Sequence, residues 1–206
     1  KLGKMRLDHN EDVSSALDYF RGQVETNSSD QNALEGLVGA TARVGAWDEH
    51  ASALERLVEL ESDPDRQLER LHALAVTFRD RVLAPRKAAM AFERIVALSP
   101  DDAAAVKGLA SVAESAGRSP AARVDILGRW VELCADPQER LEALEQIVAL
   151  AESARLPAEE VAVIYEDILE LDPANPQALS GLESFHRKRE SWAQVCEVLQ
   201  LAVDAA

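Results

Sequence analysis

Apolar residues recur three and four positions apart along nearly the whole chain. One example runs through Leu68, Leu71, Leu74, Ala75 and Phe78. Since an α-helix turns once in about 3.6 residues, this spacing collects apolar side chains on one face of a helix. A short amphipathic helix is not stable alone in water. The pattern therefore predicts many helices that pack against one another.

Prolines and small polar residues interrupt the apolar stripes at intervals. The interruptions fall at Asp63-Pro64, Ala84-Pro85, Ser99-Pro100, Gly117 to Pro120, Asp136-Pro137, Leu156-Pro157 and Asp172-Pro173. Proline suits the first turn of a helix, and a preceding Asp or Ser accepts hydrogen bonds from the free N–H groups there. We therefore expect helices to begin at these places.

The sequence also repeats itself at an offset of 73 residues. Residues 58–64, Val-Glu-Leu-Glu-Ser-Asp-Pro, return as residues 131–137, Val-Glu-Leu-Cys-Ala-Asp-Pro. The same offset relates Glu93, Ile95, Leu98 and Pro100 to Glu166, Ile168, Leu171 and Pro173, and Gly108 and Leu109 to Gly181 and Leu182. About four helices fit in one period, so the repeat predicts antiparallel hairpins stacked side by side.

The order of large, small and turn residues within half a period points to a known family. It is clearest in Val106, Leu109, Ala110, Ala113, Gly117, Ala122, Ile126 and Leu133. This pattern resembles the tetratricopeptide repeat, a helical hairpin of about 34 residues. The resemblance implies an all-α fold, a right-handed α-solenoid of stacked hairpins.

The resemblance also implies a domain organisation. Full hairpins are expected near residues 31–60, 66–99, 102–134, 139–172 and 175–206, after a half-hairpin at 11–27. Residues 1–206 are then a single repeat domain, and we expect it to be cut from a longer array. A family of this kind assembles proteins, so the resemblance implies no activity of its own.

Length and composition agree with a folded helical chain. Of 206 residues, 47% are hydrophobic and 4% aromatic, which suffices for a large core. No run of 18 apolar residues occurs, and residues 1–10 lack an apolar signal sequence. We therefore expect a cytoplasmic chain without membrane insertion. The preference for Arg and Ala suggests a bacterial source.

The net charge of −15 changes the picture of possible partners. A field of this sign repels nucleic acid and anionic membrane surfaces, and it attracts basic protein segments. Acidity also keeps proteins soluble. The charge thus excludes RNA and DNA as expected partners and leaves open whether a basic partner exists.

Residues with catalytic or metal-binding chemistry are not grouped in any motif. The histidines and cysteines are dispersed: His9, His50, His72, His186, Cys134 and Cys196. Neither the spacing of a zinc site nor a phosphate-binding loop nor a nucleophile elbow occurs. We expect no enzyme, no cofactor and no metal. Phe78, Phe92 and Tyr165 are expected in the core, and Trp47, Trp130 and Trp192 either pack between helices or anchor a ligand.

In the resembled family the first helices of the hairpins line a concave face. Helical spacing then selects a candidate partner-binding groove of Glu35, Arg43, Glu69, His72, Arg79, Lys107, Ser111, Glu114, Glu142, Glu145, Glu152, Gln177, Ser184, Arg187 and Lys188. Glu114, Glu142, Glu145 and Glu152 form an acidic stretch, whereas Arg187 and Lys188 form a basic end. A basic segment of a partner protein is therefore expected to dock over the glutamates, unless the face is simply solvated.

Two functions stay open on these grounds. The first is a protein–protein interaction scaffold that binds a segment of another protein in the concave groove. The alternative is a regulatory or spacer segment of a larger multidomain enzyme or signalling protein. The oligomeric state is not predicted. One variant of the family's groove, which grips a terminal carboxylate, needs an Asn where Ser111 follows Lys107, so this variant is not expected.

Overall fold

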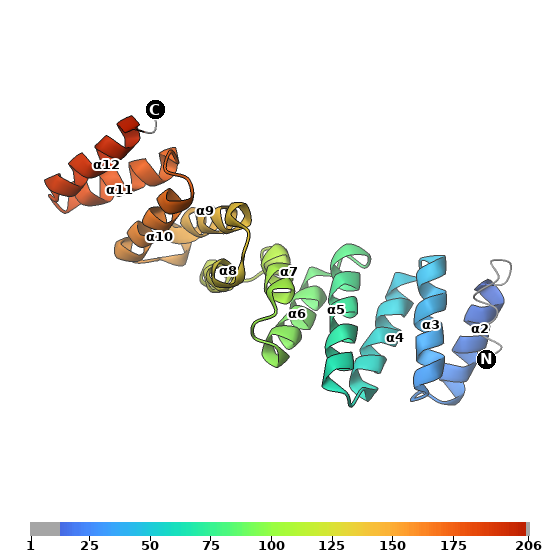
Figure 1. The fold of residues 1–206 in the computed structure, drawn as a ribbon. Helices are drawn as coiled ribbons and strands as arrows, with labels where there is room; N and C mark the ends of the chain where they lie inside the picture. Colours follow the sequence, from blue (N-terminus) through green and yellow to red (C-terminus); the bar gives the residue numbers. More distant parts are fainter. Residues whose placement is uncertain (1–12, 205–206) are drawn as a thin grey trace. The chain divides into compact units, whose positions relative to one another are not determined.

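A computed structural model describes residues 13–204 (Figure 1). All regular secondary structure in this range is α-helical, as the spacing of apolar residues predicts. The chain divides into two compact units, Lys1–Ala116 and Gly117–Ala206. We call them the N-terminal unit and the C-terminal unit and describe each by itself.

The N-terminal unit contains six of the described helices. They are α2 (Val13–Thr26), α3 (Gln31–Val44), α4 (Trp47–Leu60), α5 (Pro64–Asp80), α6 (Pro85–Leu98) and α7 (Ala103–Ala113). Each helix packs on the next one along the chain, and α5 also contacts α7. The chain reverses between neighbours, so the unit is a row of antiparallel helices (Figure 1).

The C-terminal unit repeats this arrangement. Its helices are α8 (Pro120–Leu133), α9 (Pro137–Ala154), α10 (Ala158–Leu171), α11 (Pro176–Lys188) and α12 (Trp192–Asp204). Each helix again packs on its successor. The boundary between the units falls between α7 and α8, which the sequence predicts to form one hairpin. That pairing, like the single domain, stays a prediction.

Helices begin at five of the seven predicted interruptions, and three of these beginnings have a side-chain cap. Asp63, Ser119 and Asp136 each accept a hydrogen bond from a backbone N–H of the following turn, and a proline follows each of them. At two of the interruptions the helix does not begin at the proline. Pro100 and Pro173 lie in turns, and the helices begin after Asp102 and Asn175 instead. These side chains have polar oxygens that satisfy the first N–H groups, which proline cannot do.

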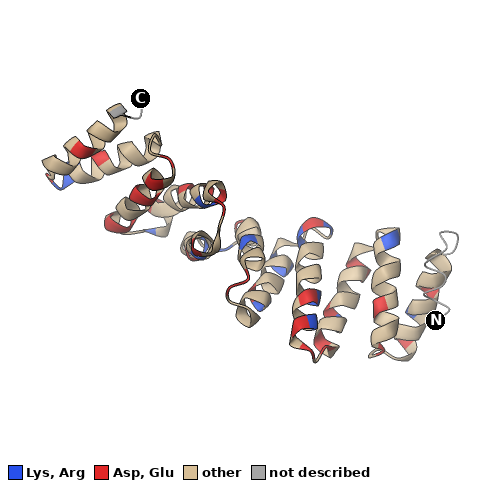
Figure 2. Cartoon of the chain, in the orientation of Figure 1, with Lys and Arg blue, Asp and Glu red and all other residues tan. Residues whose placement is uncertain are grey.

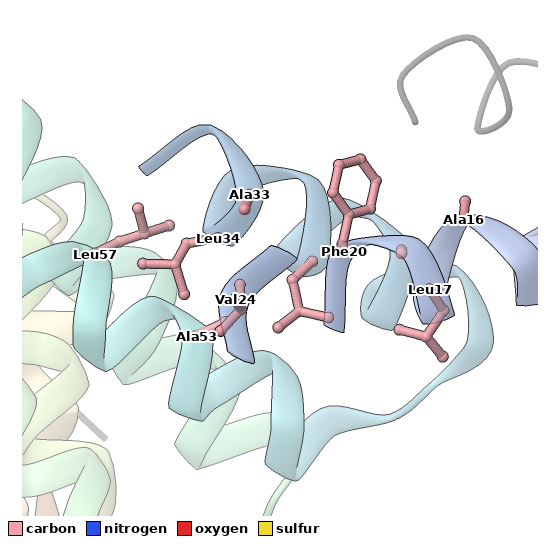
Figure 3. Close-up of a cluster of buried hydrophobic side chains, with 10 residues drawn as sticks. Ala16, Leu17, Phe20, Val24, Ala33, Leu34, Ala53 and Leu57 are labelled. Carbon is pink, nitrogen blue, oxygen red and sulfur yellow. The ribbon is translucent and has the colours of Figure 1, made fainter. Parts of the chain in front are cut away.

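A ring packed on a glycine recurs between neighbouring helices. Figure 3 shows Phe20 of α2 within the core that α2 forms with α3 and α4. A Cβ added to Gly36 of α3 would overlap its ring. The same overlap joins Phe92 of α6 to Gly108 of α7, and Tyr165 of α10 to Gly181 of α11.

This ring-on-glycine contact occurs at every second even-numbered helix. The equivalent positions of α4 and α8 hold Leu54 and Leu127, which are both buried. Two kinds of helix interface therefore alternate along the chain. This alternation explains why the sequence repeats after two hairpins rather than after one.

Candidate partner-binding site

The odd-numbered helices present the predicted groove residues mostly to solvent. Six are exposed in the N-terminal unit, namely Glu35, Arg43, Glu69, Lys107, Ser111 and Glu114, while His72 and Arg79 are half-buried. In the C-terminal unit Glu142, Glu152, Gln177, Ser184, Arg187 and Lys188 are exposed, and Glu145 is half-buried. The predicted acidic stretch thus has Glu114 in one unit and its other members in the other.

Two of the predicted groove residues have an intramolecular role. The imidazole Nε2 of His72 lies 2.7 Å from the Asp102 carboxylate, and Asp102 caps α7. At the same positions of the next repeat, the Asn175 amide donates a 2.9 Å hydrogen bond to Glu145, and Asn175 caps α11. Each pair therefore ties one odd-numbered helix to the beginning of the next.

The two ties occupy equivalent positions of the repeat. His72 and Asp102 are 30 residues apart, as are Glu145 and Asn175. His72 corresponds to Glu145, and Asp102 to Asn175, at the 73-residue offset.

Burial tends to raise the pKa of Asp102, but hydrogen bonds from the Ala105 N–H and from His72 outweigh it and lower the pKa.

Other charges of the N-terminal unit are also engaged. Glu35 pairs with Arg70 at 3.2 Å, and Arg70 also pairs with Glu61 at 3.0 Å. Arg79 binds Asp80 through two hydrogen bonds, which lower the pKa of Asp80. The Arg79 guanidinium also lies 5.9 Å from the centroid of the Phe92 ring. Because these side chains already have intramolecular partners, they are less available to bind a partner protein.

The C-terminal unit has a hollow among α9, α10 and α11. Its volume is about 650 Å³. The walls include apolar groups from all three helices and the turn after α9: Ala151, Leu156, Val161, Tyr165 and Phe185. Three predicted groove residues, Glu152, Ser184 and Lys188, also line it. The structure thus brings these three together around an apolar floor.

Charged groups at this hollow differ in whether they have partners. Nearby, Arg187 pairs with Glu183 at 2.6 Å, and Arg189 pairs with Glu159 at 3.1 Å. By contrast, the side chains of Glu152, Arg155 and Lys188 make no hydrogen bond or ion pair with any residue in the described range. Sequence reasoning missed Arg155, which lies in the turn just after α9 with φ 59°.

A second, smaller hollow of about 350 Å³ lies among α10, α11 and α12. Glu166, Glu170 and Glu197 line it together with His186 and apolar residues such as Leu169. Its acidity reflects α10, which has five acidic residues and no basic one (Figure 2). Groove reasoning missed this place because it considered only the odd-numbered helices.

The tryptophans separate into packed and exposed residues. Trp47 is half-buried, its ring lies edge-on to His50 at 5.5 Å, and Arg81 stacks over it at 4.9 Å. Trp192 at the start of α12 is 60% exposed.

Within residues 13–204, no group of three or more His, Cys, Asp or Glu side chains converges as metal ligands. No described helix is long and apolar enough to span a membrane.

Comparison with known proteins relates this chain to solved structures only. No protein-family model matches it, and no curated protein matches its sequence. The C-terminal part of a TPR repeat-containing protein from Cytophaga hutchinsonii is similar with a TM-score of 0.54 and 19% identity, covering 87% of this chain and 70% of that one. The MamA protein is similar with a TM-score of 0.50 and 17% identity, covering 85% and 91%.

A third similar structure is YrrB, described as a TPR protein with an unusual peptide-binding site. It has a TM-score of 0.50 and 17% identity, and the match covers 90% of this chain and 91% of that one. At such identities the likeness establishes the fold and nothing more. The chain has the all-α fold of tetratricopeptide-repeat proteins, and this prediction is confirmed.

Proposed function

We propose that this chain is a protein-interaction scaffold without catalytic activity, and that it binds a segment of a partner protein along α9 and α11. The fold supports this proposal, because stacked helical hairpins present extended surfaces suited to protein segments. The observation that carries it is the set of unpaired charges around the hollow of the C-terminal unit. Charged groups without partners of their own are free to pair with a ligand.

The charges along α9 suggest the polarity of the bound segment. Glu142, Ala149 and Glu152 are exposed and lie on one side of α9, since successive members are seven and three residues apart. Glu142 has no side-chain partner among the described residues. Arg155 and Lys188 lie at the other end, beside the hollow. A segment with a basic residue at one end complements Glu142.

The test compares charge reversals at two places, the exposed side of α9 and the smaller, acidic hollow. Glu142→Lys reverses a charge on α9, and Glu170→Lys makes the same change at the smaller, acidic hollow. Glu132→Lys, on the exposed surface of α8, is the matched control. Glu145 is left unchanged because its reversal would also disturb the Asn175 cap.

The three variants and the parent chain are used to capture proteins from a lysate of the source organism. Direct binding of each purified candidate then follows. We expect a partner whose affinity falls about tenfold or more with Glu142→Lys and is unchanged with Glu132→Lys. Loss with Glu170→Lys alone would instead place the partner at the acidic hollow. A chain that enriches no protein contradicts the proposal and favours a spacer role.

A further inference from the structure

The hollow of the C-terminal unit lies where the repeat has a small side chain in place of a large one. At an offset of 73 residues, Ala151 of α9 corresponds to Phe78 of α5. Phe78 is 3% exposed, so its ring is part of the core of the N-terminal unit. Ala151 has no side chain beyond Cβ, and it lines the hollow.

Exposure of the neighbouring positions agrees with this explanation. In the N-terminal unit Ala88, Phe92 and Val112 are all buried. Their counterparts in the C-terminal unit, Val161, Tyr165 and Phe185, are half-buried and line the hollow. The same helical framework thus encloses a phenyl ring in one unit and leaves the corresponding apolar walls open in the other.

The residues at the edge of the hollow also change between the units. Val82 and Ser115 of the N-terminal unit correspond to Arg155 and Lys188, so each of these two positions gains a cation, whereas in the earlier repeat Lys87 lies 5.0 Å from the centroid of the Phe78 ring. Arg79, which Asp80 engages, corresponds to the unpaired Glu152. Two free cations and one carboxylate give the edge a net positive charge, which favours an acidic group beside the bound ring.

We infer that this hollow is an anchor site for a phenylalanine of a partner segment that has an acidic residue next to it. The inference rests on the proposed function and names the side chain that the site receives. The repeat itself supplies the argument for a phenyl ring, because Phe78 occupies the corresponding place in the N-terminal unit. Arg155 and Lys188 then pair with the adjacent carboxylate.

The distance along α9 sets the spacing within the partner segment. Ten residues separate Glu142 from Glu152, which is about 15 Å at a rise of about 1.5 Å per residue. An extended peptide covers about 3.3 Å per residue. A basic residue that pairs with Glu142 is therefore expected about four or five residues from the anchoring phenylalanine.

The test uses short capped peptides and the whole chain labelled at its methyl groups. One peptide carries Phe between two glutamates, a second has Ala in place of Phe, and a third has Phe between two serines. NMR signals of the Leu156 and Val161 methyl groups report on the hollow, since both residues line it. We expect the first peptide to shift these signals, the third to bind severalfold more weakly, and the second to bind at least about tenfold more weakly.

Two sets of variants test whether the ring enters the hollow. Ala151→Phe restores the side chain that Phe78 supplies in the other unit, and Ala193→Phe adds the same ring to an exposed position of α12 as the matched control. Binding of the first peptide should fall about tenfold or more with Ala151→Phe and stay unchanged with Ala193→Phe. If Ala151→Phe disturbs folding, Arg155→Asn with Lys188→Ser tests the acidic contact instead, because Asn tolerates the positive φ of residue 155.

Equal binding to Ala151→Phe, equal binding of the alanine peptide, or no binding of the phenylalanine peptide would overturn the inference. The proposed function has a separate test, because partner capture that depends on Glu142 does not require a phenylalanine anchor. A partner lost with Glu142→Lys but retained with Ala151→Phe would leave the scaffold in place and remove only the anchor site.

Discussion

The two units share one helical repeat but differ in the side chains at equivalent positions. In the N-terminal unit Phe78 is enclosed, and the groove residue Arg79 is engaged by Asp80. In the C-terminal unit the same framework has Ala151, and Glu152 is unpaired. The difference teaches that the repeat fixes where helices lie, whereas single side chains decide whether the space between them is filled or open.

The largest expected effect comes from removing the ring that closes the N-terminal unit. Phe78→Ala should lower the free energy of unfolding by about 3–5 kcal/mol, because it deletes a buried ring and leaves a cavity. Ala151→Phe, the reverse change in the C-terminal unit, should cost less than about 1.5 kcal/mol, since its site is already open. Urea unfolding measures the change in the free energy of unfolding for each variant, and amide hydrogen exchange shows in which unit the change occurs. Equal costs would contradict the comparison.

The ring-on-glycine contacts give the next largest effect. Gly108→Ala places a methyl group into the ring of the buried Phe92, and this overpacking should cost about 1–3 kcal/mol. Gly181→Ala meets Tyr165, which is half-buried beside the hollow and has room to move, so it should cost less. Gly128→Ala is the control, because a Cβ there meets nothing within 4 Å. Thermal unfolding of the three variants ranks them.

The fold was predictable because it depends on patterns that extend over many residues. The spacing of Leu68, Leu71 and Leu74 predicts a helix regardless of detail, and the 73-residue offset adds the stacking. At Pro100 and Pro173 the dipeptide alone does not say whether proline starts a helix or a turn. Asp102 and Asn175, a few residues further on, decide it.

The candidate site was only partly predictable, for a different physical reason. Helical spacing identified Glu152, Ser184 and Lys188 as residues of one face, and the structure places all three at one hollow. Helical spacing could not show that Glu145 accepts a hydrogen bond from Asn175, the N-cap of α11, since that contact joins residues of different helices. Nor did it find the hollow, which depends on how the side chains of three helices pack.

The ties between odd-numbered helices should have smaller effects that are similar in both units. Asp102→Ala and Asn175→Ala each remove a helix cap and a side-chain tie, and we expect a cost of about 1–2 kcal/mol for each. His72→Ala and Glu145→Ala remove the tie alone and should cost about 0.5–1.5 kcal/mol. Thermal unfolding provides the measurement. If Glu145→Ala does not change the stability, the Glu145 carboxylate does not stabilise the fold and is available to a partner.

The smallest expected effect is a pH dependence confined to the N-terminal unit. His50 is buried, with its Nδ1 3.0 Å from the Val38 carbonyl oxygen, and Arg123 stands at the equivalent position of the next repeat. Burial lowers the pKa of His50, although the contact with Val38 opposes this. The folded chain then binds this proton less readily than the unfolded chain, whose histidine pKa is about 6.5. Stability is therefore complete above that pH and falls as the pH decreases below it.

Urea unfolding between about pH 7.5 and about pH 5.5, followed by NMR signals of residues 31–60, measures this loss. His50→Gln should remove part of it, because the glutamine side chain does not titrate. His186→Gln, which changes a half-buried histidine of the C-terminal unit, is the control and should leave the loss in residues 31–60 intact. If the parent chain and His50→Gln lose stability equally, carboxylates rather than His50 control the pH dependence. The protonation of a single buried histidine would then not distinguish the two units.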